Sequence, residues 1–167
     1  MSRGFVKEGD QEEPPIIPPR AALPAGAINY VTQNGLEELK NEKDNLEKER
    51  AEISVDDEAE KRRMQAIVDG KLNLLVERIN SARIIKAEEQ QQDEVRFGAK
   101  VKIKNLDNNN IQEFQIVGVD EADVKKQKIA FVAPIARAIT GKKTGEVSEF
   151  KLGNEMRKLE IIEIQYP

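Results

Sequence analysis

Residues 32–86 constrain the fold most, because this stretch is highly charged, contains no proline and repeats its apolar residues at alternating steps of three and four. Such heptad spacing produces a narrow apolar seam, which is typical of a helix that faces one partner helix. The seam positions are Leu36, Leu39, Lys43, Leu46, Arg50 and Ile53 in the first half, and Val68, Leu72, Leu75, Ile79 and Ala82 in the second. Two matching seams in one chain predict a pair of packed helices.

A break between the two halves is predicted at Ser54. Residues 54–57 read Ser-Val-Asp-Asp, a capping-box arrangement in which an acid follows the capping serine by three positions. We predict antiparallel helices over residues 33–53, with Thr32 as N-cap, and over residues 55–86, joined by a very short turn. The first helix would be about 30 Å long. The hairpin would be a finger with acids at its tip, and the open alternative is a coiled-coil spacer or a dimerisation zipper.

The composition narrows the classes of function. The chain of 167 residues is 38% hydrophobic and 35% charged, which suits one compact domain plus an extended element better than one large core. It has no cysteine and no histidine, so it lacks disulfides, thiolates and the commonest general base, and most enzyme mechanisms are disfavoured. No apolar run approaches a membrane span, and the N-terminus lacks the layout of a signal peptide. We expect a cytoplasmic protein.

The charge is distributed unevenly along the chain. Residues 95–167 contain 13 Lys and Arg against 10 Asp and Glu, whereas the remainder contains 14 against 21. Neither part has the broad basic stripe of an autonomous nucleic-acid-binding protein. We therefore expect a protein partner, with no autonomous DNA binding and no membrane contact.

The N-terminal stretch has a composition of its own. Residues 1–29 contain five of the seven prolines together with scattered acids, which favours extended, solvated backbone. We predict a disordered arm over residues 1–29, and the alternative is that its Pro-Pro-Ile-Ile-Pro-Pro centre is a docking peptide. The hairpin would occupy residues 30–87, and the polar run at residues 88–94 would be a linker.

Residues 95–167 form the second predicted domain, because the apolar period changes there to two. A short helix over residues 134–139 is opened by Pro134 and closed near Gly141. Strands are expected at residues 101–103, 114–117, 129–132, 146–152 and 156–164, with an Asn-rich turn after the first and Gly153-Asn154 before the last. The predicted fold class is α+β, an antiparallel two-helix coiled-coil hairpin followed by a small antiparallel sheet with one short helix.

Motifs in both halves resemble the GreA/GreB transcript-cleavage factors of bacterial RNA polymerase, in the order and spacing of that family. In the helical half they are Val31-Thr32-Gln33-Asn34-Gly35-Leu36 and Asn80-Ser81-Ala82-Arg83-Ile84-Ile85. In the C-terminal half they are Phe97-Gly98-Ala99, Ile116-Val117-Gly118, Asp120-Glu121-Ala122-Asp123 and Pro134-Ile135-Ala136-Arg137-Ala138-Ile139. The resemblance covers residues 30–165.

The resemblance implies a C-terminal domain of the FK506-binding-protein-like (FKBP-like) fold that docks on the rim of the polymerase's secondary channel, through Pro134, Ile135 and Arg137. It also implies a coiled coil that enters the channel, where acids at its tip help to hold a second magnesium ion and an attacking water. The polymerase then cleaves the 3′ end of backtracked RNA, so the factor is an accessory and holds no metal or cofactor alone. The tip acids here are Asp56, Asp57 and Glu58, and their hard oxygens suit magnesium.

The tip departs from the family pattern of Asp-Leu followed by Glu-Asn-Ala-Glu-Tyr. Residues 57–61 read Asp-Glu-Ala-Glu-Lys, and Ser54 stands where the leading Asp is expected. The hairpin is also shorter than the family's by about a dozen residues, which removes about 9 Å of reach. The tip acids therefore have an alternative role, since acids in the first turn stabilise a helix through its dipole.

Two other functions remain open. The first is a regulator that binds the secondary channel and competes with cleavage factors without stimulating cleavage. The second is a peptidyl-prolyl isomerase, which the implied fold suggests and which needs an aromatic-lined pocket. The aromatic residues of the C-terminal half are few and are expected mainly in the core: Phe97, Phe114, Phe131, Phe150 and Tyr166.

Overall fold

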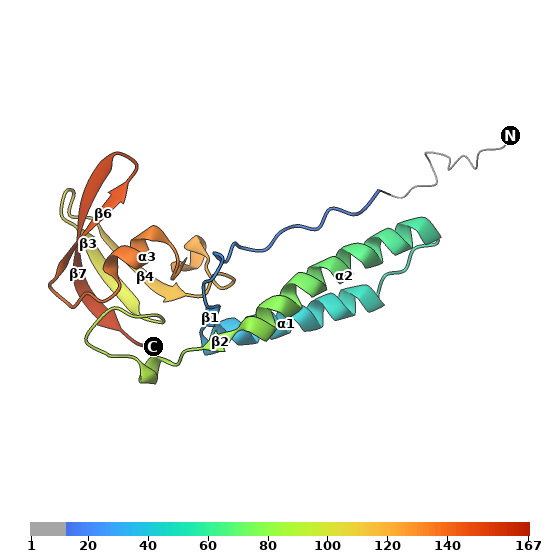
Figure 1. Ribbon diagram of the computed structural model, residues 1–167, viewed down its shortest axis with the longest axis horizontal. Coiled ribbons are helices and arrows are strands. Elements are labelled where there is room, and N and C mark those ends of the chain that lie inside the picture. The colour runs from blue at the N-terminus through green and yellow to red at the C-terminus, as the bar shows by residue number, and fades with distance from the viewer. Residues whose placement is uncertain (1–12) are drawn as a thin grey trace.

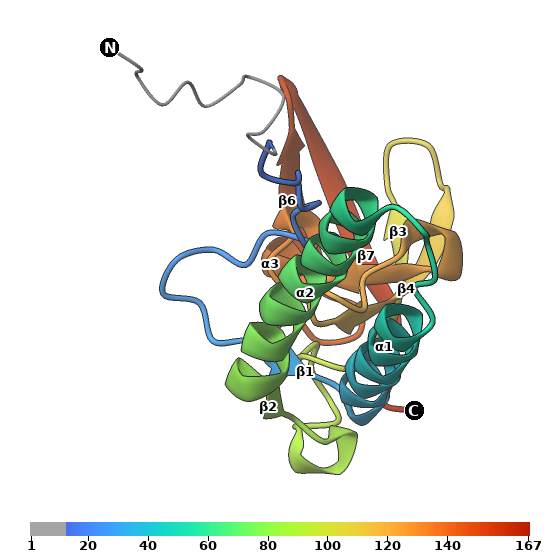
Figure 2. The same ribbon diagram turned by 90° about the vertical axis from the view of Figure 1, so that its right-hand side faces the viewer.

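A finger of two antiparallel helices, α1 (Gln33–Ala51) and α2 (Glu58–Ser81), projects from a sheet domain in the computed structural model, which describes residues 13–167 (Figure 1). Viewed along the finger, the two helices lie side by side in front of the sheet domain (Figure 2). The seams face each other, and the buried side chains of the helix pair are Leu39, Leu46, Val68 and Leu75. The predicted two-helix hairpin is therefore confirmed. Neither helix, nor any other among the described residues, is long and apolar enough to cross a membrane.

The caps of the two helices differ in how well they were predicted. Thr32 caps α1, because its hydroxyl accepts a hydrogen bond from the Gly35 N–H at 2.9 Å. The N-cap of α2 is Asp57, whose carboxylate accepts from the Ala59 N–H at 2.9 Å. The prediction of a capping box at Ser54 is wrong, and the connecting turn spans residues 52–57. A carboxylate directly before the helix satisfies its free N–H groups, so the turn does not need the serine.

The second helix also ends earlier than the predicted residue 86. After Ser81 the chain becomes extended, and β2 (Arg83–Ile84) pairs in parallel with β1 (Tyr30–Val31). The Arg83 N–H donates to the Asn29 carbonyl at 2.9 Å, and the Ile85 N–H donates to the Val31 carbonyl at 3.1 Å. Pairing between two segments far apart in the sequence thus replaces the last helical turn and closes the base of the finger.

Five strands form the C-terminal sheet, in the order β5-β4-β3-β7-β6. Their bounds are Lys100–Asn105 for β3, Ile111–Val117 for β4, Lys128–Ala130 for β5, Val147–Leu152 for β6 and Glu155–Gln165 for β7. The β3–β4 and β6–β7 hairpins are antiparallel, as predicted. The edge strand β5 is parallel to β4, so the prediction of a wholly antiparallel sheet is wrong there. The connection at residues 118–127, which includes the 3-10 turn η3 (Val124–Lys126), returns the chain to the level of Gln115 in β4 and permits the parallel pairing.

The short helix α3 (Pro134–Ile139) has the predicted bounds and covers the sheet. Its Ala136 and Ile139 are fully buried against core residues of the strands. These core residues include Val101, Ile103, Phe114, Ile116, Leu159 and Ile161. The α+β class is thereby confirmed, and the core leaves the remaining faces of α3 free to point outward.

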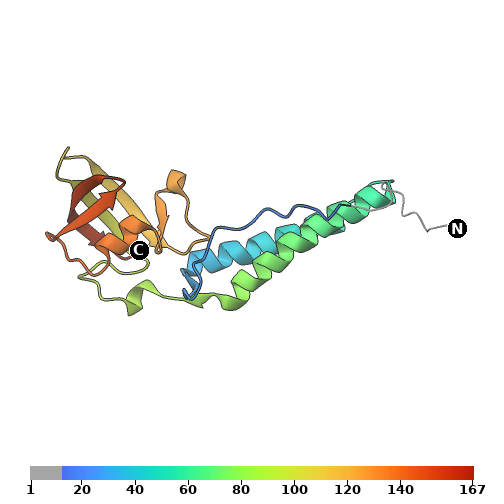
Figure 3. The same ribbon diagram turned by 45° about the horizontal axis from the view of Figure 1, so that its top comes forward.

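The N-terminal segment lies along the finger. Residues 13–29 run extended along α2 between the tip and the base of the finger (Figures 1 and 3). The Arg20 guanidinium bonds the Glu42 carboxylate of α1, and the Ala21 carbonyl accepts from Arg78 of α2. The disordered arm stays a prediction, and in the structure residues 13–29 have partners on the finger although the segment has no core of its own. Residues 1–12 lie outside the described part of the chain.

Candidate functional site

The far end of the finger is an acidic tip, formed by the turn at residues 52–57 and the first turn of α2. Its acids are all exposed: Glu52, Asp56, Asp57, Glu58 and Glu60. The three acids selected from the sequence, Asp56, Asp57 and Glu58, are consecutive here and stand at the N-terminal end of α2. Carboxylates at that end are favoured by the helix dipole. The alternative role of the tip acids, stabilisation of the helix, therefore applies to Asp57, which caps α2.

The tip offers oxygen ligands without forming a complete metal site. Within residues 13–167, no group of three or more potential ligand side chains is arranged to hold an ion. Magnesium prefers carboxylate oxygens and commonly takes only one or two from a protein, with the remaining positions filled by water or phosphate. The chemistry of the donor set thus suits a tip that completes a metal site in another molecule.

The second set of predicted residues lies on α3, in the sheet domain and away from the tip (Figure 1). Pro134 and Arg137 are exposed, whereas Ile135 is half-buried and packs against the core. The structure therefore makes Pro134 and Arg137 available to a partner and gives Ile135 a packing role. Since the tip and α3 belong to opposite parts of the molecule, a single partner would have to be large enough to contact both.

The junction between finger and sheet domain is built on Glu121, which the sequence indicated only as part of the motif Asp120-Glu121-Ala122-Asp123. Glu121 is buried and accepts hydrogen bonds from the Thr32 hydroxyl at 2.5 Å and the Asn34 side-chain amide at 3.0 Å. Its third partner is the Lys128 ammonium, 3.1 Å from Oε2. Thr32 thus caps α1 and anchors it to the sheet domain at the same time.

Asp120, the preceding residue, binds two arginines. Arg20 Nε lies 2.9 Å from Oδ1, and Arg78 Nη1 lies 3.1 Å from Oδ2. The Asp120 side chain is only 6% exposed, so both ion pairs are shielded from water. The only charged residue in residues 14–29 is Arg20, and that isolation was the available sequence signal for a specific contact.

Aromatic packing completes the junction. The ring of Tyr30, at the base of the finger, lies 5.9 Å from that of Phe97 and 5.5 Å from that of Phe131, measured between centroids. The Phe97 and Phe131 rings are 5.6 Å apart and meet edge to face. These rings pack on one another, and Phe114 and Phe150 belong to the core. This use of the aromatic residues argues against the isomerase alternative.

Gly118→Ala is expected to loosen this junction. A Cβ atom on Gly118 would lie 2.5 Å from the Tyr30 carbonyl oxygen, a backbone atom that can move only with β1. Overpacking of this kind costs about 1–3 kcal/mol, measurable as a fall in the free energy of unfolding in urea. Equal stability of the Gly118 variant and the parent would show that the contact is not tight in solution.

Comparison with known proteins identifies relatives of the whole arrangement. The family model described as "Transcription elongation factor, GreA/GreB, C-term" matches residues 90–166. A protein named transcription elongation factor GreA from Thermodesulfovibrio yellowstonii is 33% identical over 151 residues, which cover 81% of this chain and 96% of the relative. Another of that name from Bartonella henselae is 40% identical over 98 residues, covering 59% of this chain and 62% of the relative.

Two solved structures also match the chain, at lower sequence identity. The GreA/GreB elongation factor from Nitrosomonas europaea is 18% identical, with a TM-score of 0.41, and the match covers 84% of this chain and 99% of that chain. The GreA factor homolog 1 protein of Thermus thermophilus is also 18% identical, with a TM-score of 0.39 and coverage of 83% and 99%.

Proposed function

Because the chain belongs to the GreA/GreB family of transcription elongation factors, we propose that it binds bacterial RNA polymerase at the secondary channel and promotes cleavage of backtracked RNA. Members of this family are accessory factors that act with RNA polymerase, rather than enzymes themselves. The protein would rescue arrested complexes by assisting the polymerase's own hydrolysis. Its place of action would be the cytoplasm, together with the polymerase.

One observation carries this proposal: Asp56, Asp57 and Glu58 are exposed and consecutive at the end of a finger anchored to a separate domain. The sheet domain would dock on the polymerase through Pro134 and Arg137, and the finger would then enter the channel. A magnesium ion held mainly by the polymerase would stabilise the charge that develops on the attacking and leaving oxygens of the RNA. The tip carboxylates would help to hold that ion and to orient an attacking water.

Within the tip, Asp57 would have two tasks. Its Oδ1 atom accepts from the Ala59 and Glu60 N–H groups, at 2.9 and 3.5 Å, which restrains the direction of the carboxylate. Asp56 precedes it in the turn and Glu58 begins the helix. A restrained carboxylate loses less entropy on binding an ion than a freely rotating one. The cap would therefore prepare the tip for its role as a ligand donor.

The second candidate function is channel binding without cleavage. Ser54 occupies the position of the family's leading acid and is exposed in the turn. The first helix has 19 residues, which gives it a length of about 28 Å. The missing leading acid and the short first helix favour a finger that occupies the channel and excludes other factors without stimulating cleavage.

A cleavage assay separates the two candidates. The cognate polymerase is assembled in a backtracked elongation complex, and RNA cleavage is followed with and without this protein, while binding to the polymerase is measured in parallel. Faster cleavage supports the first candidate. Tight binding without faster cleavage makes the protein a channel-occupying regulator, and absence of binding contradicts both.

Arg137→Glu tests the docking surface. Arg137 is exposed on α3, so reversal of its charge should leave the fold intact. If the guanidinium contacts the polymerase, the dissociation constant should rise about tenfold to hundredfold. Lys151→Glu on β6 is the matched control, with the same charge change at another exposed position of the sheet domain. An equal effect of the two substitutions would indicate a general loss of electrostatic attraction and not a contact at α3.

A further inference from the structure

We propose that residues 14–24, which we call the strap, fix the angle between the finger and the sheet domain, with Arg20 as the positioning residue. This inference concerns the geometry of the free protein and does not rest on RNA cleavage. The strap lies along the finger from near the tip to the base (Figures 1 and 3), and two kinds of contact hold it, one apolar and one ionic.

The apolar contact is a notch at Gly70 in the middle of α2. A Cβ atom on Gly70 would lie 2.5 Å from Ile17 Cδ1 and 2.6 Å from Ile17 Cγ1, so only glycine leaves room for this side chain. The neighbouring Ile16 is 90% exposed. Because one isoleucine enters the notch and the adjacent one does not, the register of the strap on α2 is defined.

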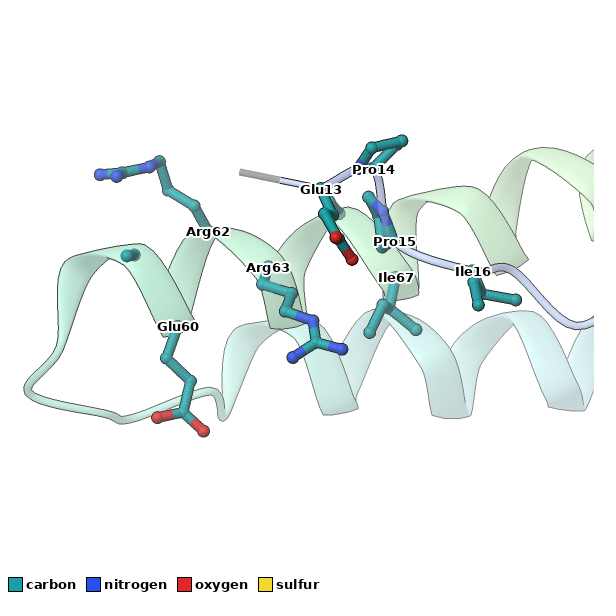
Figure 4. A pocket seen from close by; sticks show the side chains of 10 residues that line it. Glu13, Pro14, Pro15, Ile16, Glu60, Arg62, Arg63 and Ile67 are labelled. Atoms are coloured by element: carbon teal, nitrogen blue, oxygen red, sulfur yellow. The ribbon is translucent and has the colours of Figure 1, made fainter. Parts of the chain in front are cut away.

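Prolines lower the cost of ordering the strap. Near the tip, Pro14 and Pro15 pass beside Arg63 and Ile67 of α2 and border an open hollow of about 560 Å³ (Figure 4). A proline has a restricted φ, so the unfolded strap has fewer conformations to lose when it docks. A few contacts can therefore hold a segment that contributes almost nothing to the core.

The ionic contact joins both parts of the molecule through one guanidinium. Arg20 Nη1 and Nη2 donate to the two carboxylate oxygens of Glu42 on α1, at 2.7 and 3.0 Å. Arg20 Nε donates to Asp120 of the sheet domain at 2.9 Å. The planar fork of arginine can serve two carboxylates at once, which the single ammonium of lysine cannot do in this geometry.

Arg78 of α2 supports the same cluster. Its Nη1 atom donates to Asp120 at 3.1 Å, and its Nη2 atom donates to the Ala21 carbonyl of the strap. The hydrogen bond to Glu42 and the charge of Asp120 raise the pKa of the Arg20 guanidinium, although burial acts in the opposite direction. The cluster thus balances two arginines against two carboxylates.

Two separated points of attachment explain how the strap would set an angle. The first is the junction at Glu121, where Thr32 and Asn34 of the finger are bound. The second is Arg20, which links Glu42, in the third turn of α1, to Asp120. Arg78 of α2 also reaches Asp120 directly, and the Tyr30 ring packs on Phe97 and Phe131, so the base of the finger has further attachments. Arg20 adds the link from Asp120 to a carboxylate farther along α1, and this link restrains the pivoting that is expected of domains joined by a small interface.

Distance measurements between two spin labels test this proposal. The chain contains no cysteine, so labels can be placed on Ser54→Cys at the tip and Asn108→Cys in the β3–β4 turn, both exposed positions. The labelled full-length parent should give one narrow distribution of distances. Arg20→Gln should broaden it about twofold, as expected for a released domain pair, and Arg20→Lys should give an intermediate width.

Arg50→Gln is the matched control. Arg50 makes a similar two-pronged contact with Asp69, at 2.6 and 3.2 Å, but both residues belong to the finger. The control should keep the narrow distribution, even if it lowers stability. The proposal is overturned if Arg20→Gln also keeps it.

Gly70→Leu gives an independent test from outside the ionic cluster. Leucine favours helices more than glycine does, so α2 should keep its circular dichroism signal while the larger side chain expels Ile17 from the notch. The distance distribution should broaden as in Arg20→Gln. An unchanged distribution would show that the notch has no part in positioning. Since no polymerase is present, neither result depends on whether the protein stimulates cleavage.

Discussion

Replacing Asp56 and Asp57 together by asparagine is expected to lower the rate of stimulated RNA cleavage by about 100-fold. Carboxylates that complete a metal site stabilise the transition state by several kcal/mol. Asparagine is nearly as good an N-cap as aspartate, so α2 should retain its start at residue 58. The substitution therefore removes charge and ligand strength without removing the cap. Cleavage rates in the backtracked complex measure the effect, and circular dichroism checks the helix.

The control for this prediction keeps the same change in charge. Asp44 and Glu49 are exposed acids on α1, outside the turn and the first turn of α2. Asp44→Asn with Glu49→Gln should leave cleavage near that of the parent. If the tip variant and this control behave alike, the acids act through the overall field of the finger and not as ligands.

Leu75→Ala is expected to destabilise the finger by about 2–5 kcal/mol, the usual cost of emptying a well-packed site. Leu75 is 0% exposed and is one of only five buried residues in the cluster that holds the helices together. The sheet domain has a separate core, so hydrogen exchange should accelerate in α1 and α2 while β3 and β7 remain protected. Uniform acceleration in both parts would instead show that they unfold as one unit.

The Leu75 variant should still bind the polymerase through the sheet domain but should lose its effect in the channel. Leu152→Ala provides the control, because Leu152 is 50% exposed on β6 and its truncation should change stability by less than about 0.5 kcal/mol.

Elements whose apolar residues repeat at a regular spacing were predictable from the sequence. The seams around Leu39 and Leu75 revealed the finger, Thr32 revealed its start, and Pro134 revealed α3. The two hairpins of the sheet followed from alternation and turn residues. In each case the deciding interactions lie within one element or between elements that are neighbours in sequence, so the spacing of apolar and turn residues indicates them.

Elements that depend on distant partners were not predictable. Residues 83–84 continue the helical pattern, yet they pair with β1 about fifty positions earlier. The edge strand β5 is parallel because of the path that the chain takes over residues 118–127. The strap looks like a solvated tail, and its key contact joins Arg20 to Asp120, 100 positions away. Local composition does not contain such contacts.

The sequence by itself therefore determined a two-helix finger with Asp56, Asp57 and Glu58 near its end, a small sheet domain with α3, and a family resemblance that the comparisons confirm. The packing of Ile135, the bonds of Glu121 and Asp120 to the finger, and the contacts of the proline-rich segment with α1 and α2 emerged from the three-dimensional arrangement alone. The physical reason is that periodicity records which face of an element is buried, whereas the orientation of whole domains depends on a few buried polar contacts between residues far apart in the chain.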